Sequence, residues 1–421
     1  MSSRQHSAKK QSAPSRRAAK VSKAVKAGKG ASTTYKPARE YSKKKDYNKL
    51  ALALHKKLRG KLAISLKAPL ESKDDWSMMY SPGVGAVSTQ LYKRPQDARE
   101  YTSKRNSVAV ISDGSAILGL GNLGPIPALP VMEGKCAIFK AMADIDAWPI
   151  VLDVHTPDEI VAAVKAIAPS FGGINLEDIA APQCFEIEER LQQELNIPVM
   201  HDDQHGTAIV VLAGLINAAK VVEKRLEKLR VVVVGAGAAG RAITLILAHA
   251  GISEIIVTDS TGAVYAGRPG LSGYKKALAE MTNGNRLSGD VMTVIEGADV
   301  VIGVSGPGTI APAHIERMAP QPIVFALANP IPEIMPEDAQ RAGAAVVATG
   351  RSDYPNQINN ALVFPGVFRG ALDRQLCHIT TEHKVAAAHK LAALIKQPTA
   401  QEIVPTLQDP RVVKAVASAI R

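Results

Sequence analysis

The stretch RVVVVGAGAAGRAITLILAHAG, residues 230–251, decides the expected fold. A run of four valines is typical of a strand buried on both faces, and three spaced glycines follow it directly before an apolar, helix-like segment. In a strand–turn–helix unit such glycines permit a tight turn, close approach of the backbone to a pyrophosphate, and close packing of the helix on the strand. The stretch therefore predicts a Rossmann-type dinucleotide site. Its expected contacts are Gly235, Ala236, Gly237, Ala238, Ala239 and Gly240.

The residue that would meet the adenosine ribose is Asp259, which ends the next β-rich run, 19 residues after Gly240. An acidic side chain at this place accepts a hydrogen bond from the ribose hydroxyl and repels a 2′-phosphate, which favours NAD. Three basic residues follow closely and would pair with such a phosphate, namely Arg268, Lys275 and Lys276. The residues therefore leave the choice between NAD and NADP open.

Short β-rich runs recur after the first unit, and each ends at a Gly, Asp or Asn. They are EIIVTD, ADVVIGVSG, PIVFALANP and AAVVATG. Near-continuous Val and Ile runs imply strands buried on both faces, and hence a parallel sheet covered by helices. We therefore expect a Rossmann-type, doubly wound parallel-sheet NAD(P)-binding domain over residues 206–421.

The preceding residues, 46–205, mix expected helices and strands. Leucines at helical spacing predict a helix over Asn48–Lys57, and a capping pattern predicts a second helix over Thr156–Ile167. Apolar runs predict strands at Ser107–Ile111 and Pro149–Val154, whereas the Gly/Pro-rich residues 118–130 predict no regular structure. These patterns favour an N-terminal α/β domain.

The basic character of the chain belongs to its first residues. The formal net charge is +12, but residues 1–45 carry 14 Lys and Arg against one acid, and the rest carries 37 basic and 38 acidic residues. The Ser/Ala/Lys-rich composition of residues 1–45 buries too little surface to offset the entropy of ordering, which predicts a disordered tail. Its roles could be solubilisation, mitochondrial targeting, or nonspecific contact with nucleic acid.

Composition narrows the class of protein further. No apolar run approaches the roughly 20 residues that span a bilayer, so we expect no membrane association. Three widely spaced cysteines without a C-x-x-C pattern indicate neither a disulfide framework nor a zinc knuckle. We expect a cytoplasmic protein, or a mitochondrial matrix protein if residues 1–45 are a transit peptide. Nucleic-acid contact is confined to that tail, because the neutral remainder offers no basic face.

Two acidic pairs precede the dinucleotide unit: Glu177-Asp178 in NLEDI and Asp202-Asp203 in HDDQHG. Each pair alone is typical of a solvated turn or a helix cap. Together they favour a site for Mg²⁺ or Mn²⁺, because hard cations prefer carboxylate oxygens. The two histidines of HDDQHG, four residues apart, leave zinc as an alternative.

Tyr80 in MYSPGVG and Lys135 in EGKC are ordinary surface side chains when taken alone. The order and spacing of all the motifs, however, resemble those of the malic enzyme family. These motifs are YSPGV, SDGSAILGLGNLG, EGK, NLEDI, HDDQHGTA, GAGAAG, ALANP and QINNALVFPG. The resemblance runs from about Tyr47 to Asp373 and points to the shorter, bacterial-type branch.

The resemblance implies oxidative decarboxylation of malate to pyruvate and CO₂, with reduction of NAD(P)⁺ and a requirement for Mg²⁺ or Mn²⁺. It also implies metal-dependent decarboxylation of oxaloacetate, and a homodimer. Carried over by motif, Lys135 is the general base, Tyr80 the general acid, and Asp202 a catalytic residue beside the lysine. A lysine near a metal and a cofactor cation is expected to have its pKa lowered enough to accept a proton.

The same resemblance makes Glu177, Asp178 and Asp203 the metal ligands. Because adjacent residues of a regular strand point to opposite faces, the first two must lie in a bend. Substrate is expected to contact Lys135, Asn329 and Asn360, with Asn329 also contacting the nicotinamide ribose.

The site is expected in a cleft between two domains that meet near residue 205. Ser115-Ala116 stands where the longer branch has an arginine that grips malate, so the resemblance assigns no anchor for the distal carboxylate. A metal-free Rossmann dehydrogenase is the alternative among oxidoreductases, but it leaves both acidic pairs unexplained.

Overall fold

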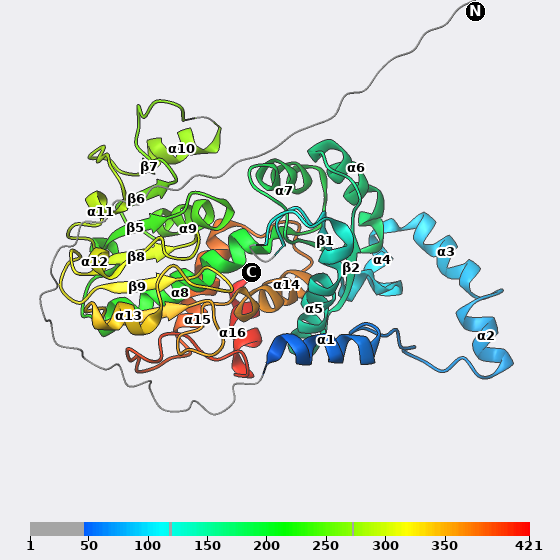
Figure 1. Cartoon of the computed structure of the whole chain (residues 1–421). Helices are drawn as coiled ribbons and strands as arrows, with labels where there is room; N and C mark the ends of the chain where they lie inside the picture. Colours follow the sequence, from blue (N-terminus) through cyan, green and yellow to red (C-terminus); the bar gives the residue numbers. More distant parts are fainter. Residues whose placement is uncertain (1–45, 118–119, 272) are drawn as a thin grey trace, which may run out of the picture. The chain divides into compact units, whose positions relative to one another are not determined.

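The computed structural model describes residues 46–117, 120–271 and 273–421 (Figure 1). The tail of residues 1–45, with its predicted disorder, lies outside the described residues. The chain divides into two units, residues 1–54 and 55–421, and the second carries both β-sheets. Helix α1 (Tyr47–Leu58) confirms the helix predicted at this place.

The first sheet has four parallel strands in the order β2-β1-β3-β4. They are β1 (Ser107–Ser112), β2 (Asp146–Val151), β3 (Gly173–Leu176) and β4 (Val199–His201). Helix α5 (Pro125–Ala143) packs on one face, and α6 (Pro157–Ile167) and α7 (Gln183–Glu194) pack on the other. The strand predicted from the apolar run 149–154 begins and ends three residues earlier than expected.

Helix α5 shows that one prediction was wrong: residues 125–130 of the Gly/Pro-rich stretch are helical. The first four N–H groups of a helix have no acceptor within it, so Pro125 and Pro127 cost the helix little. Pro130 lies farther in, where its missing N–H removes one hydrogen bond. The prediction from composition was wrong because the effect of a proline depends on its position in the helix.

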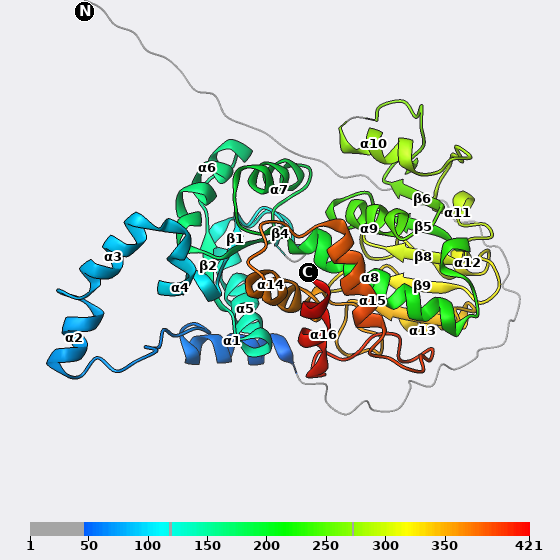
Figure 2. The ribbon, with the colours of Figure 1, turned by 180° about the vertical axis from the view of Figure 1, so that it is seen from behind.

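Short helices fill the segment before the first sheet. They are α2 (Lys73–Met79), α3 (Val84–Lys93), η1 (Pro95–Asp97), α4 (Ala98–Tyr101) and η2 (Ser103–Asn106). Helices α2 and α3 have no buried residue, and both lie apart from the two sheets in Figures 1 and 2. The large apolar side chains exposed over residues 62–106 are Leu62, Ile64, Leu66, Trp76, Met78, Met79, Tyr80, Val84, Tyr92 and Tyr101. We call this set the exposed apolar surface.

Helix α8 (Asp202–Val221) links β4 to the first strand of the second sheet and is buried along most of its length. Its apolar side chains belong to a single cluster that also contains residues of β1 and of the second sheet. The hydrophobic core is therefore continuous between the sheets. The domain boundary predicted between residues 205 and 206 falls within this helix and stays a prediction.

The second sheet has six strands in the order β10-β9-β8-β5-β6-β7. They are β5 (Arg230–Val234), β6 (Glu254–Asp259), β7 (Gly262–Ala263), β8 (Val300–Gly303), β9 (Ile323–Ala326) and β10 (Val346–Thr349). All neighbours are parallel except β6 and β7, which confirms the predicted parallel sheet. The strand order reverses between β5 and β8. In open α/β sheets, ligands bind outside the carboxyl ends of the strands at such a point.

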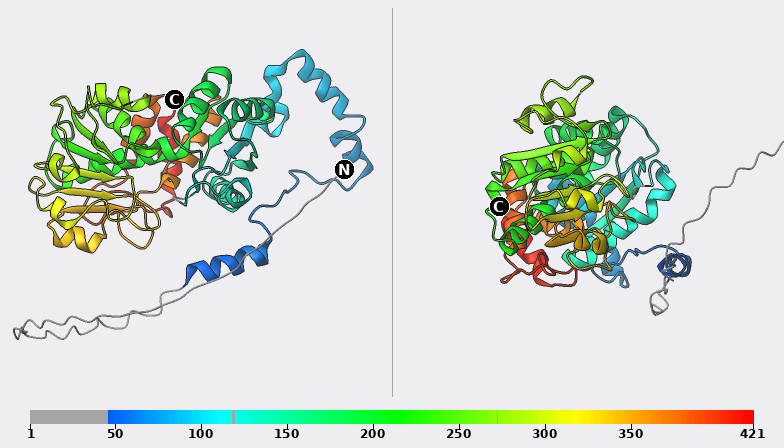
Figure 3. Two further views of the ribbon diagram at one scale, coloured as in Figure 1. Left: turned by 45° about the horizontal axis from the view of Figure 1, so that its top comes forward. Right: turned by 60° about the vertical axis from the view of Figure 1, so that its left-hand side comes forward.

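Helices cover both faces of the second sheet (Figure 3). Helices α8, α9 (Ala238–His249) and α15 (Thr381–Ala392) lie on one face. Helices α11 (Val291–Val294), α12 (Pro312–Ile315) and α13 (Pro336–Arg341) lie on the other. The remaining elements are η4 (Ala168–Ser170), η5 (Leu226–Lys228), α10 (Tyr274–Met281), η6 (Asn360–Leu362), α14 (Phe364–Asp373) and α16 (Arg411–Ala419). Over the described residues, none of the helices combines the length and the apolar character that a bilayer crossing requires.

Candidate active site

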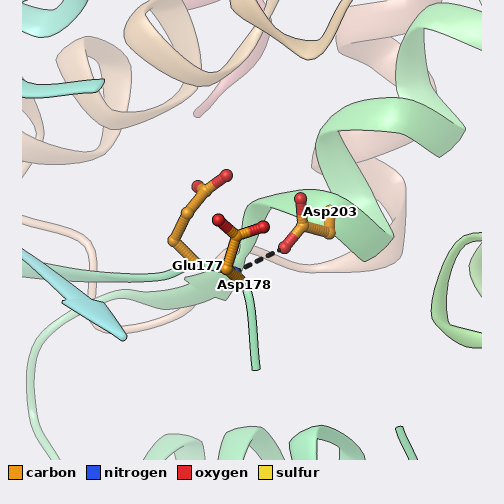
Figure 4. A group of neighbouring side chains, drawn as sticks. All are labelled: Glu177, Asp178 and Asp203. Carbon is orange, nitrogen blue, oxygen red and sulfur yellow. Dashed lines mark hydrogen bonds between the residues drawn. The ribbon is translucent and has the colours of Figure 1, made fainter. Parts of the chain in front are cut away.

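Three carboxylates meet where β3 and β4 end (Figure 4). Glu177 and Asp178 directly follow β3, and Asp203 lies in the first turn of α8, which directly follows β4. One oxygen from each side chain lies within 4.8 Å of the others. The structure thus brings together the three residues predicted to bind a metal, because parallel neighbouring strands end at the same edge of their sheet.

The backbone at Asp178 explains how two adjacent residues face the same site. Its φ is +52°, in the left-handed region that residues with a side chain rarely adopt. The backbone N–H of Asp178 donates a hydrogen bond of 2.8 Å to Oδ2 of Asp203, which holds the bend against α8. The chain therefore leaves the alternation of a strand at this point, as a shared site for Glu177 and Asp178 requires.

The electrostatics of this carboxylate cluster fit a hard cation. Burial and the neighbouring Asp203 carboxylate raise the pKa of Glu177 well above its ordinary value, and Lys135 only partly opposes them. Crowded, buried anions are stabilised by a divalent cation, and oxygen-only donors suit Mg²⁺ or Mn²⁺. Among the described residues, neither His201 nor His205 belongs to a cluster with metal-binding spacing, which disfavours the zinc alternative.

Lys135 points from α5 towards this cluster. Its Nζ lies 2.5 Å from Oδ2 of Asp202 and 2.9 Å from Oε1 of Glu177, and 4.7 Å above the ring of Phe364. Burial acts to lower the pKa of Lys135, but the carboxylates of Asp202, Glu177 and Asp203 raise it above its ordinary value. The sequence led us to expect a lowered pKa for Lys135, whereas the neighbouring carboxylates raise it. The expected lowering requires a cation that offsets the charge of these carboxylates.

Asp202 and Asn360 meet at the start of α8. A Cβ at Gly206 would lie 1.9 Å from Oδ1 of Asp202 and 2.9 Å from Cβ of Asn360, so only glycine allows this approach. Asp202 is fully buried and accepts the hydrogen bond from Lys135. The structure therefore places Asn360 beside the Lys135–Asp202 pair. Asn329 lies in the loop after β9.

Glu188 in α7 is a residue that the sequence interpretation missed. Its Oε1 accepts the backbone N–H of His201 at 2.8 Å, and its Oε2 accepts the side-chain amide of Gln204 at 3.1 Å. The same Oε2 lies 3.0 Å from Nε2 of His205. Although burial opposes it, His205 and then Lys384 lower the pKa of Glu188 to about 2. Glu188 thereby fixes the turn from β4 into α8, on which the acidic pair of HDDQHG depends.

A signal for Glu188 was present in the sequence. The buried face of α7 consists of Cys184, Ile187, Glu188 and Leu191. This is the i, i+3, i+4, i+7 pattern of a core-facing helix stripe, with a carboxylate in place of an apolar residue. A charge at such a position has to be paired in the folded protein, which marks it as a candidate for a buried network.

Tyr80 is not brought to Lys135 within one chain. Its side chain is 68% exposed, and no hydrogen bond of its hydroxyl is found in the parts of the chain that the structure describes. The side-chain partners of Lys135 over the same residues are Asp202, Glu177 and Phe364. Tyr80 lies between α2 and α3, the two helices that stand apart from α8 in Figures 1 and 2.

A second site lies at the carboxyl ends of β5, β6 and β8, where a pocket of about 800 Å³ opens. Gly235, Ala236, Gly237 and Asp259 line it, and Ala238, Ala239 and Gly240 begin α9 beside it. A Cβ at Gly240 would lie 1.8 Å from the carbonyl oxygen of Gly235. The third glycine is therefore required for the close packing of helix on strand.

The Asp259 carboxylate at this pocket is already saturated with donors. Arg268 binds both of its oxygens, at 3.0 and 2.6 Å, and Lys275 lies 2.7 Å from Oδ2. The backbone and hydroxyl of Thr261 donate to Oδ1. Burial acts to raise the pKa of Asp259, but Arg268, Lys275 and Thr261 lower it well below its ordinary value. Of the three basic residues considered from sequence, two meet Asp259, and Lys276 does not.

Comparisons with known proteins agree with this arrangement. The family model of the malic enzyme N-terminal domain matches residues 59–192, and that of the malic enzyme NAD binding domain matches residues 204–421. The bifunctional malic/malolactic enzyme of Bacillus subtilis is 52% identical over 373 residues, 88% of this chain and 91% of its own. The NADP-dependent malic enzyme of Halomonas elongata is 46% identical over 390 residues, 88% of this chain and 92% of its own.

A solved structure extends the likeness to three dimensions. The crystal structure of the NAD-dependent malic enzyme from Thermotoga maritima is 47% identical, with a TM-score of 0.86 over 88% of this chain and 98% of that one. The family models together match more than half of the chain. The chain belongs to the malic enzyme family, whose members are oxidoreductases that decarboxylate malate with NAD(P).

Proposed function

We propose that this chain oxidises and decarboxylates malate at the Lys135 site with the help of a divalent cation held by Glu177, Asp178 and Asp203. The observation that carries the proposal is the position of the Lys135 amine, 2.9 Å from a proposed metal ligand and 2.5 Å from Asp202. A hydroxyl bound at the carboxylate cluster would lie within reach of that amine. A cation held there would supply a Lewis acid for the C2 oxygen and for the ketone of oxaloacetate.

The residues of the chain divide the work by their positions. In its neutral form, Lys135 takes the proton of the C2 hydroxyl. A bound nicotinamide would accept the hydride from C2, and the product of these two transfers is oxaloacetate. Asp202 accepts a hydrogen bond from the lysine and keeps its amine aimed at the site. Loss of CO₂ from C4 leaves its electron pair in an enolate, and Tyr80 then donates a proton to C3 to give pyruvate. Decarboxylation of added oxaloacetate requires only the loss of CO₂ and the protonation of C3.

The exposed position of Tyr80 leads to the proposed oligomer. We infer a homodimer in which Tyr80 of one subunit acts at the partner subunit's Lys135. Extensive exposed apolar surface on a monomer marks an interaction site, and the exposed apolar surface contains Tyr80 with nine other large apolar side chains. A two-fold dimer brings the same patch of both copies together and would complete two sites at once.

Mixed dimers test this arrangement. Tyr80→Phe and Lys135→Ala are each expected to be nearly inactive, because each lacks one proton-transfer group. After subunit exchange, mixed dimers should regain one intact site of two, so random mixing should restore about a quarter of the wild-type rate. Malate-dependent pyruvate formation measures the recovery, with differently tagged subunits to verify exchange.

The control for these mixed dimers is Tyr92→Phe, which alters a tyrosine of the same segment that is 87% exposed. It should retain wild-type activity alone and in mixtures. Verified mixed dimers that remain inactive would place Tyr80 at the site of its own subunit. A monomer in sedimentation experiments would refute the dimer itself.

For the cofactor, we propose that both NAD and NADP are accepted. Asp259 pairs with two cations, Arg268 and Lys275, so a 2′-phosphate at this place would meet a net positive charge. Arg268 would then keep the Asp259 carboxylate paired. Lys275 is the more exposed of the two cations and is the one expected to turn to the phosphate. Lys275→Met should raise the KM for NADP by about tenfold, the scale of a lost hydrogen bond to a charged group, and change that for NAD much less.

Initial rates with each cofactor measure this prediction, with Lys276→Met as the matched control. Lys276 is the adjacent residue and does not contact Asp259, so its loss should leave the ratio of the two KM values unchanged. Equal effects of Lys275→Met on both cofactors would show that Lys275 does not recognise the phosphate.

A further inference from the structure

The segment after β9 contains a buried carboxylate with no assigned role. Glu333 is 1% exposed, its Oε1 accepts the backbone N–H of Ser305 at 2.8 Å, and its Oε2 accepts that of Ala328 at 3.0 Å. Its own carbonyl oxygen accepts the N–H of Gly308 at 3.0 Å. One residue therefore joins the loop after β8, which contains Ser305 and Gly308, to the loop after β9, which contains Ala328.

The sheet is shaped to admit this side chain. A Cβ at Gly303, the last residue of β8, would lie 2.6 Å from Cδ and 2.7 Å from Cγ of Glu333. Any larger residue at that position would displace the carboxylate from between the loops. A buried carboxylate is costly unless it is well hydrogen-bonded, so both the glycine and the two N–H donors are needed to accommodate it.

Both joined loops belong to the dinucleotide side of the molecule. Ser305, Gly306 and Thr309 line the pocket at the ends of β5 and β8, where the strand order reverses. Asn329, a proposed contact of the nicotinamide ribose, directly follows Ala328. The Glu333 carboxylate thus sets the spacing between a wall of the pocket and Asn329, although Glu333 itself does not line the pocket.

We propose that Glu333 is a positioning residue for the dinucleotide, whose carboxylate holds the β8 and β9 loops at the separation that the cofactor requires. The inference deepens the proposed function, since it rests on the cofactor role assigned to this pocket and to Asn329. A carboxylate accepts a hydrogen bond at each oxygen. A glutamine of the same shape would set an NH₂ group against one of the two N–H donors, so the loops would separate at that bond.

Direct binding of NADH to the enzyme, without malate or metal, tests the proposal. Glu333→Gln should weaken the Kd for NADH by about tenfold or more, the scale of a lost hydrogen bond to a charged acceptor. Fluorescence of the bound dihydronicotinamide reports the Kd. The matched control is Glu316→Gln at the end of α12, an exposed carboxylate with no side-chain hydrogen bond or ion pair among the described residues, and it should bind like wild type.

Acidity supplies a second readout. Burial raises the pKa of Glu333, opposed by the backbone N–H groups of Ala328, Ser305 and Leu327 and by its own. The main influences on it are therefore burial and backbone N–H groups. Because the folded-state pKa is raised, protonation begins at a higher pH than for an exposed glutamate, and wild-type affinity for NADH should fall as the pH falls through that value. Glu333→Gln should lack this component and bind weakly at every pH.

The possible results separate the hypotheses. The positioning role would be overturned if Glu333→Gln bound NADH with the affinity and pH dependence of the wild type. It would also be overturned if the weakening of the Kd were matched by a loss of thermal stability. Should this variant not fold, Glu333→Asp, which keeps the charge but cannot reach both loops, should fold and show the same weakening. If the wild type did not bind NADH, the cofactor role of the pocket would be refuted. If the wild type bound NADH and Glu333→Gln had the same Kd, only the role of Glu333 would be refuted.

Discussion

Replacement of Lys135 by alanine is expected to lower malate oxidation by about 10²–10⁴-fold, the range typical of a lost general base. The Lys135 amine is the cation that contacts both Asp202 and Glu177 over the described residues, so no neighbour takes its place. Small added amines should restore part of the rate, because they can occupy the vacated space. Decarboxylation of oxaloacetate should fall less, since it needs no proton removed from a hydroxyl.

Two assays on the same preparations separate these effects: cofactor reduction with malate, and pyruvate formation from oxaloacetate with Mn²⁺. Lys140→Ala is the matched control, because Lys140 lies on the same helix but is 56% exposed and pairs with Asp144 and Asp146. Normal malate oxidation by Lys135→Ala would contradict the whole catalytic set carried over from the family.

Asp203→Ala should lose measurable affinity for Mn²⁺ and, with it, malate turnover. Removing a residue that only supports a ligand typically costs about 10–100-fold in metal affinity, and loss of a ligand should cost at least as much. In addition, Asp203 accepts the backbone N–H of Asp178, so its loss also frees the left-handed bend that aims the other two carboxylates. Excess Mn²⁺ should restore only part of the turnover.

Titration with Mn²⁺, followed by the electron spin resonance of the free ion, measures this binding without reference to activity. Asp158→Ala is a fitting control, since Asp158 is also in the first turn of a helix but has a side chain that is 86% exposed. An unchanged Mn²⁺ affinity in Asp203→Ala would show that the three clustered carboxylates are not the ligand set.

Much of the fold could be predicted because its signals are local. The Val-rich runs of the second sheet are buried on both faces, and Thr156 and Glu159 form the capping box that their spacing indicated. The limits of β2 could not be predicted from its apolar run. Asp146 and Ala147 join the strand through their partners on β1, Ser107 and Val108, and such pairing depends on residues distant in sequence.

The candidate site was predictable only as far as its motifs extend. Glu177 meets Asp203 because β3 pairs with β4. Glu177 and Asp178 face the same site because the backbone bends at Asp178, and the amino-acid composition does not indicate such a bend. Glu333 was missed because it acts on backbone N–H groups, which carry no residue-specific pattern. Glu188 was missed although its place in the buried stripe of α7 indicated it. The place of Tyr80 depends on contacts that lie outside a single chain in the proposed dimer.

Helix α8 gives the molecule one further property. Its first turn carries Asp202 and Asp203, and the rest of its length is enclosed by the core that both sheets share. During folding, Asp202 and Asp203 reach their fixed positions only when both sheets have packed around α8. Proteins open in cooperative units, and this helix belongs to the unit at the centre of the molecule. A partly unfolded intermediate that lacks either sheet would therefore lack the catalytic chemistry as well, and activity would report on the integrity of the core.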